Sequence, residues 1–157
     1  MYRLDLMKGL VQRVTRGSVT VGSEVVGSIG PGLVVLLGVK QDDTEADARL
    51  LAGKTANLRI FSDDQGKMNR SIQDSGGAIL VISQFTLYAN TRKGNRPSFV
   101  EAAPPVLAEE LYGVYAAVLR RILGDERVAT GTFRAEMQVE IINDGPVTIE
   151  LRSERGD

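Results

Sequence analysis

An almost continuous apolar run at residues 33–39, marked off by Gly32 and Gly38, constrains the fold of this chain more than any other feature. Such a run suits a strand that is buried on both faces, because neither set of alternating side chains meets water. Valines separated by glycines precede it, which indicates further strands, and Gly22-Ser23 between them is typical of a hairpin turn. The first 40 residues are therefore predicted to be mainly β-structure.

The remaining elements complete an α+β pattern. Residues 42–44 supply an N-cap and acidic first-turn groups for a helix that reaches about residue 58. Pro104 and Pro105 open a second helix, which Gly124 ends. Apolar segments predict strands at residues 78–85, near 137–142 and at 147–151. The chain has 157 residues and is 43% hydrophobic, so we expect one domain with a mixed or antiparallel sheet and two main helices.

The composition restricts both chemistry and partners. The chain has no histidine and no cysteine, which excludes imidazole bases, thiol nucleophiles and ordinary zinc sites. The segment Asp63-Asp64-Gln65-Gly66 lacks the alternating ligands and final glutamate of a calcium loop, so we expect no metal and no other cofactor. A net charge of −1 means that a nucleic-acid partner needs a local basic patch.

The ends and the hydropathy of the chain point to a soluble cytoplasmic protein. Residues 1–6 are too short and too charged for a signal peptide. No stretch approaches the roughly 20 apolar residues that a membrane-spanning helix needs. We therefore expect no membrane partner.

Two short motifs carry most of the functional signal. Ser83-Gln84-Phe85-Thr86 places hydroxyl and amide groups at the end of an apolar strand, and Gly145-Pro146 precedes the last strand. Taken alone, the first is a polar strand end and the second a turn. Likewise, Arg13 alone is a strand-surface charge, and Phe99 a core aromatic.

Several motifs follow one another in a fixed order. They are Val11-Gln12-Arg13-Val14, Gly32-Leu33-Val34-Val35-Leu36-Leu37-Gly38-Val39, Arg59-Ile60-Phe61-Ser62-Asp63, Gly66-Lys67-Met68-Asn69, Ser83-Gln84-Phe85-Thr86-Leu87, Gly94-Asn95-Arg96-Pro97-Ser98-Phe99 and Asn143-Asp144-Gly145-Pro146-Val147-Thr148. In this order the chain resembles the D-aminoacyl-tRNA deacylase family, from Met7 to about Leu151. Residues 1–6 then look like an N-terminal extension, and residues 7–157 like the deacylase domain.

The resemblance implies a barrel-like sheet and a homodimeric hydrolase with active sites at the subunit interface. Such an enzyme cleaves the ester that joins a D-amino acid, or glycine, to the terminal ribose of tRNA. Gly145-Pro146 of one subunit, with a cis peptide bond, enters the site of the other subunit. Ser83-Gln84-Phe85-Thr86 forms the floor of that site. An L side chain would find no room there, so chirality would be read by exclusion.

The predicted chemistry leaves the role of Thr86 open. Thr86 is either a nucleophile, which needs an activating base, or an orienting group beside Ser83. In the second case the ribose 2′-hydroxyl or a positioned water supplies the chemistry. Backbone amides near Gln84, Phe85 and Thr86 would hold the developing oxyanion.

Residues outside these two motifs have supporting roles. Arg13 is expected to hydrogen-bond carbonyls at the Gly-Pro turn. Phe85 or Phe99 is expected to line the adenine or aminoacyl pocket. The polar segment that holds Arg92, Lys93 and Arg96 is either a solvated loop or a contact to tRNA phosphates.

Three alternatives to D-aminoacyl-tRNA hydrolysis remain. A related editing enzyme would remove misplaced L-amino acids and would hold Gly145-Pro146 trans. A noncatalytic nucleic-acid-binding module is a different class, which the net charge and the single short basic segment disfavour. A small-ligand-binding oligomer without turnover would account for the missing histidine, as substrate-assisted catalysis also does.

Overall fold

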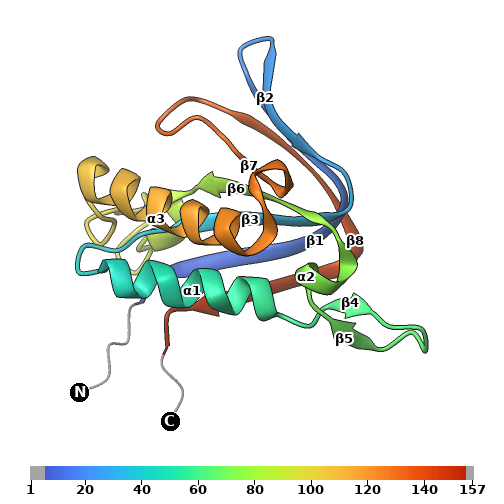
Figure 1. Ribbon diagram of the computed structural model, residues 1–157. Coiled ribbons are helices and arrows are strands. Elements are labelled where there is room, and N and C mark those ends of the chain that lie inside the picture. The colour runs from blue at the N-terminus through green and yellow to red at the C-terminus, as the bar shows by residue number, and fades with distance from the viewer. Residues whose placement is uncertain (1–5, 155–157) are drawn as a thin grey trace.

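The computed structural model describes residues 6–154 and shows two long helices side by side on one face of a curved sheet (Figure 1). The elements, in chain order, are β1 (Lys8–Val21), β2 (Glu24–Ile29), β3 (Gly32–Gly38), α1 (Glu45–Asn57), β4 (Phe61–Ser62), β5 (Met68–Arg70), α2 (Ile72–Ser75), β6 (Ala78–Ser83), the 3-10 turn η1 (Phe85–Tyr88), α3 (Pro105–Leu123), the 3-10 turn η2 (Asp125–Arg127), β7 (Val128–Thr130) and β8 (Gln138–Arg152).

β1 organises the sheet because it pairs with three other strands. Its residues 8–14 pair antiparallel with β3 and its residues 17–21 with β2, while β8 runs antiparallel along the other edge of β1. β3, β6 and β7 continue the sheet as parallel neighbours. The sheet curls until β2 approaches β7: a Cβ added to Gly27 would lie 2.8 Å from the Thr130 carbonyl oxygen. The expected α+β fold with a mixed, barrel-like sheet is confirmed.

Burial on both faces of β3 is also confirmed. Leu33, Val35 and Leu37 belong to the core between the sheet and the two long helices. Val34 belongs to a second core, on the inside of the curl, where it joins Leu80 of β6. Fully burying each of these side chains is worth about 1.5–3 kcal/mol, so β3 stabilises both layers at once.

Local signals set the starts of both long helices. The Thr44 hydroxyl accepts a hydrogen bond from the Asp47 amide, and the Asp47 carboxylate accepts one from the Thr44 amide at 2.8 Å, which caps α1. α3 begins at Pro105, whose missing amide costs nothing in the first turn. Where the helices meet, the buried hydroxyls of Thr55 and Tyr115 lie 2.8 Å apart, and burial raises the pKa of the Tyr115 phenol.

Two predicted strand boundaries are wrong. The strand predicted over residues 78–85 ends at Ser83, because the chain then turns into η1, where the Leu87 and Ala89 amides donate to carbonyls three residues earlier. The strands predicted near 137–142 and at 147–151 are one strand, β8. β1 pairs with β8 on both sides of Gly145-Pro146, and the register shift between them absorbs the turn as a bulge.

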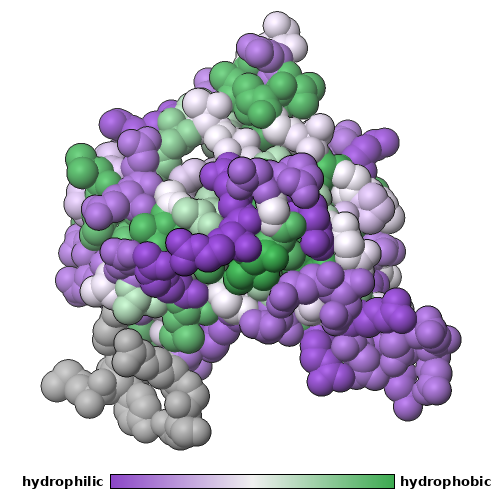
Figure 2. Space-filling view, in the orientation of Figure 1, coloured by the Kyte–Doolittle hydropathy of each residue, from purple (hydrophilic) through white to green (hydrophobic). Residues whose placement is uncertain are grey.

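The short elements were not predicted. β4, β5, α2 and β7 span two to four residues each, which is too short for a hydrophobic period to show. α2 depends instead on a capping box between Ser71 and Asp74. Figure 2 shows that the β4–β5 hairpin is hydrophilic and that an apolar patch lies at the tip of β2, where Val25 and Val26 are exposed.

The ends of the chain are described only in part. Residues 1–5 of the predicted N-terminal extension lie outside the described residues. Leu6 is buried, and its carbonyl accepts a hydrogen bond from the Tyr88 hydroxyl. The division of the chain after residue 6 stays a prediction. Between residues 6 and 154, no helix has the length and apolar character needed to cross a membrane.

Gly32→Ala is expected to destabilise the protein by about 3 kcal/mol or more. A Cβ at Gly32 would lie 1.8 Å from the Ala78 carbonyl oxygen, so the parallel pairing of β3 with β6 would have to open. Gly30→Ala is the matched control, because a Cβ there meets nothing within 4 Å. Urea unfolding of both variants measures the difference, and equal midpoints would show that the β3–β6 contact tolerates a methyl group.

Candidate active site

A cavity of about 550 Å³ opens where β6 leaves the sheet. Its lining is mostly apolar and comes from the end of β6, the segment before α3, the first turns of α3 and the connection between β7 and β8. The lining residues are Ile82, Ser83, Gln84, Phe85, Phe99, Ala102, Ala103, Pro105, Ala108, Phe133, Arg134, Ala135, Met137 and Val139. This size and apolar character are typical of a small-molecule or cofactor pocket.

The predicted motif supplies part of the cavity lining. Ser83, Gln84 and Phe85 line the cavity. Thr86 does not line it; this residue is exposed on η1, and its hydroxyl accepts a hydrogen bond from the Gln84 side-chain amide. Thr86 thus follows a lining residue in the chain without itself lining the cavity.

Two aromatic side chains form one wall. Phe85 and Phe99 meet edge to face, with ring centroids 5.1 Å apart. The segment that carries Phe99 is fastened to the chain after β3, because Ala103 donates to the Val39 carbonyl and Gln41 donates to the Glu101 carbonyl. The pairing of two predicted pocket residues therefore depends on contacts between segments about 60 residues apart in the sequence.

Another part of the lining contains residues that the sequence analysis missed. Phe133 packs against Tyr112 of α3 with ring centroids 6.1 Å apart. The Tyr112 hydroxyl donates to the Val81 carbonyl at 2.9 Å, and burial raises the pKa of this phenol, so it stays protonated at neutral pH. Arg134 and Met137 follow on the same connection. Neither lies in a recognisable motif, so no sequence signal marked them.

The amides expected to form an oxyanion site are not equivalent. The Gln84 amide already donates to the Leu37 carbonyl at 2.8 Å and is unavailable to a ligand. Within residues 6–154, the amides of Phe85 and Thr86 have no acceptor. Of the three amides predicted to hold an oxyanion, two remain free to do so.

The Gly145-Pro146 segment is exposed, and side chains on both sides fix its position. Its peptide bond is cis, as the resemblance implies. Arg13 donates from Nε to the Asp144 carbonyl at 2.9 Å and from Nη1 to the Ile60 carbonyl at 2.7 Å. The guanidinium thereby joins the segment to the chain between α1 and β4.

Asn143 closes the same bulge from inside. Its side-chain oxygen accepts the Val147 amide at 2.7 Å, and its side-chain nitrogen donates to the Val147 carbonyl and to the Thr148 hydroxyl. A Cβ at Gly145, where φ is +139°, would lie 2.7 Å from a Val147 methyl carbon. The turn therefore has little freedom to change shape.

The Gly-Pro segment is not among the described residues that line the cavity. Gly145-Pro146 stands opposite Arg13, level with the start of β3, whereas Ser83 pairs with the last part of β3, three strands across. Within the described chain, residues 143–148 are no part of the cavity lining.

The predicted basic segment is an exposed loop next to the Phe99 wall. Asn90 and Ser98 pair with each other through two backbone hydrogen bonds of 2.7 and 2.8 Å, which close the loop. Arg92, Lys93 and Arg96 are exposed on it. In the described part of the chain, no three acidic side chains lie together as metal ligands would.

Asn143→Ala is expected to cost about 1–3 kcal/mol, because the buried Val147 would lose the acceptor of its amide. Asn95→Ala, in the exposed basic loop, is the control and should change the free energy of unfolding by less than about 0.5 kcal/mol. Chemical denaturation measures both. If the two variants were equally stable, Asn143 would have no part in holding the turn.

Comparisons with known proteins show which family this chain resembles. Residues 10–152 match the family model described as D-Tyr-tRNA(Tyr) deacylase. A "D-aminoacyl-tRNA deacylase" from Roseiflexus sp. (strain RS-1) is 60% identical over 94% of each chain, and one from Heliobacterium modesticaldum (strain ATCC 51547 / Ice1) is 58% identical over 96% of this chain and 99% of its own.

Two solved structures share the fold. One titled "c-Myc DNA Unwinding Element Binding Protein" is 46% identical, with a TM-score of 0.89 over 94% of this chain and 99% of its own. Another, titled "Structural Analysis of a probable eukaryotic D-amino acid tRNA deacylase", is 19% identical with a TM-score of 0.81 over the same shares. On the family model and the two bacterial relatives, this chain belongs to the D-Tyr-tRNA(Tyr) deacylase family of hydrolases.

Proposed function

We propose that this protein hydrolyses the ester between a D-amino acid and the terminal ribose of tRNA. One observation carries the mechanism: the described residues that line the cavity at the end of β6 include a hydroxyl and an amide side chain but no carboxylate, and the chain has no histidine. Such a site can bind and orient an ester but contains no side-chain base. The substrate itself then supplies the missing group.

The proposed step adds water to the ester carbonyl carbon. The vicinal 2′-hydroxyl of the terminal adenosine relays a proton from this water, and the amides of Phe85 and Thr86 hold the oxyanion that forms. The bond from carbon to the ribose 3′-oxygen then breaks, and this oxygen takes the proton. Ser83 and Gln84 orient the ester, and Thr86 orients Gln84 through their hydrogen bond. The products are the free D-amino acid and tRNA.

A second copy of the chain completes the proposed site. Gly145-Pro146 does not line the described cavity of its own chain, which supports the proposal that a partner brings this segment to Ser83 and Gln84. The segment is exposed, and Arg13 and Asn143 hold it in one shape. Its carbonyls would accept the substrate α-amino group and leave no space for an L side chain. Glycine has no side chain to exclude, so glycyl-tRNA would also be cleaved.

Binding of nucleic acid without catalysis is the second candidate. It is favoured by the 46% identical structure whose title names a DNA-unwinding-element binding protein. The net charge of −1 disfavours it, since binding of generic nucleic acid needs an excess of cations. As an aminoacyl-tRNA hydrolase, the protein would act in the cytoplasm.

Hydrolysis of matched D-tyrosyl-tRNA and L-tyrosyl-tRNA tests the proposal. The D ester should be cleaved and the L ester spared. Gly145→Ala should lower the rate on the D ester by at least about 100-fold, because misplacing a positioning group by about 1 Å has an effect of this size. Gly53→Ala, on α1 with no atom within 4 Å of its Cβ, should behave as wild type.

The other outcomes of this assay are equally informative. Cleavage of the L ester would identify an editing enzyme for L-amino acids. If neither ester were cleaved and a generic DNA duplex were bound, the protein would be a nucleic-acid-binding module.

Charge reversal in the basic loop tests whether it contacts tRNA phosphates. The triple change of Arg92, Lys93 and Arg96 to Glu should weaken tRNA binding and flatten its salt dependence, at about 0.7–0.9 in the log–log slope for each lost contact. The D-over-L preference should stay unchanged. Arg121→Glu, exposed at the far end of α3, is the control. If the triple variant had the salt-dependence slope of the wild type, the loop would not contact tRNA phosphates.

A further inference from the structure

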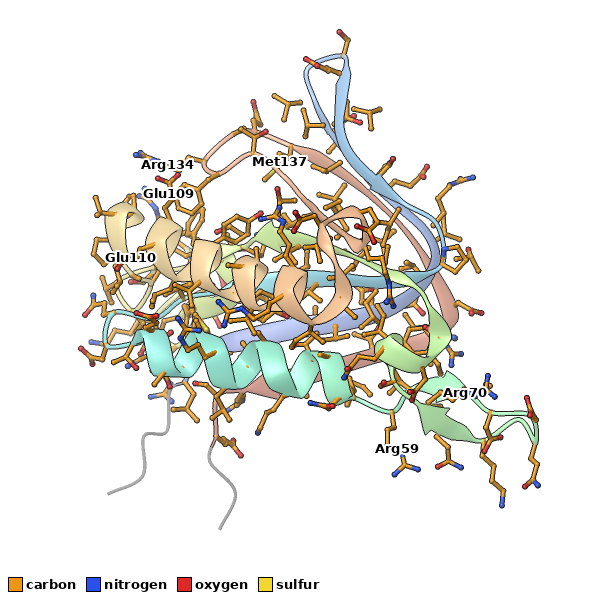
Figure 3. The ribbon with its side chains drawn as sticks, in the orientation of Figure 1. Arg59, Arg70, Glu109, Glu110, Arg134 and Met137 are labelled. Atoms are coloured by element: carbon orange, nitrogen blue, oxygen red, sulfur yellow. The ribbon has the colours of Figure 1, made fainter. Side chains whose placement is uncertain are left out.

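Arg134 has an unusual place in the cavity. It lies on the connection between β7 and β8, and among the described residues that line the cavity it is the one that carries a charge. Figure 3 shows it above the first turns of α3, near Glu109, whereas Arg59 and Arg70 lie at the opposite end of the molecule. Its side chain is exposed, so it stands at the rim rather than at the floor.

The backbone at Arg134 is also unusual. Its φ is +66°, and no other non-glycine residue between 6 and 154 has a positive φ. A side chain in this region is uncommon because its Cβ crowds the following carbonyl oxygen, and glycine would adopt it freely. The turn is set by its neighbours, since the Ala135 amide donates to the Thr132 carbonyl at 3.1 Å. A strained residue at the edge of a binding cavity is a candidate for function.

The guanidinium is available to a ligand. Within the described residues it has no ion pair and donates no hydrogen bond, although the Glu109 carboxylate lies nearby in Figure 3. By comparison, Arg13 and Arg127 each donate two hydrogen bonds to backbone carbonyls. Among the described residues, Arg134 thus makes no interaction in the fold that would account for its positive charge.

We infer that Arg134 binds the phosphate group that joins the terminal adenosine of the tRNA to the nucleotide before it. The inference rests on the proposed function, which places the ester at Ser83 and Gln84. With the ester at the floor and the adenosine in the apolar cavity, its 5′-phosphate emerges at the rim. A guanidinium presents paired N–H groups that match two phosphate oxygens. Arg134 is therefore a positioning residue that sets how deep the acceptor end enters.

Two small esters of adenosine test the inference. The 3′-D-tyrosyl ester of adenosine lacks the phosphate, and that of adenosine 5′-monophosphate carries it. In the wild type the phosphate should raise kcat/KM by about 10–100-fold, mainly through KM, as charge-assisted hydrogen bonds do. In Arg134→Gln this ratio should fall to near one, and Arg134→Lys should keep part of it. Arg121→Gln should keep the wild-type ratio.

A second measurement uses D-tyrosyl-tRNA. Arg134→Gln should raise KM and reduce the salt slope by about 0.7–0.9, the effect of one phosphate contact. Arg134→Gly should show the same loss while raising the melting temperature by a few degrees, because it relieves the backbone strain. Loss of function in a more stable protein cannot come from unfolding.

The failures are distinguishable. In one case the wild type cleaves D-tyrosyl-tRNA, and Arg134→Gln changes neither KM nor the ratio of kcat/KM between the esters with and without the phosphate. This result would overturn the inference and leave the proposed function standing. Wild type that cleaves neither D-tyrosyl-tRNA nor either small ester would overturn both.

Discussion

Double-sided burial of β3 is the constraint on which the other features depend. Its odd-numbered side chains are covered by α1 and α3 on one face of the sheet, and Val34 is covered on the other face by the curled part of the sheet. A strand of this kind leaves no polar surface along its length, so groups that bind ligands must lie where strands end or bulge. The cavity lies at the end of β6, which is parallel to β3, and the Gly-Pro turn lies at a bulge in β8.

The cavity and the Gly-Pro turn lie where strands end or bulge, and each is held in place by its own hydrogen bonds. The floor is anchored by the Gln84 amide on β3, and the Gly-Pro turn by Arg13 and Asn143. Each anchor is a hydrogen bond to the backbone, which fixes position without adding a reactive group. A hydrolase without a side-chain base depends on such positioning, because correct placement of water, ester and amides provides most of what the protein can contribute.

Much of the fold followed from local patterns. The β1–β2 hairpin, β3, α1 and α3 have turn residues, caps or apolar periods that act within a few residues, and these were predicted. The elements that were missed have two to four residues, which is too short for a hydrophobic period to show. β4 and β5 pair with each other, α2 depends on its capping box, and β7 pairs with the distant β6. The single β8 was predicted as two strands because Gly145-Pro146 normally ends pairing, whereas here the long β1 continues to pair beyond the bulge.

The candidate site divides in the same way. The sequence by itself determined the chemistry that is available: no imidazole, no thiol, and hydroxyl and amide groups in Ser83-Gln84-Phe85-Thr86. Only the tertiary structure decided that Phe99 meets Phe85 and that Arg134 reaches the rim of the cavity. It also decided that Thr86 and Gly145-Pro146 are not among the described residues that line the cavity of their own chain. The reason is physical: residue types are local properties, whereas a cavity forms only where segments distant in the chain pack together.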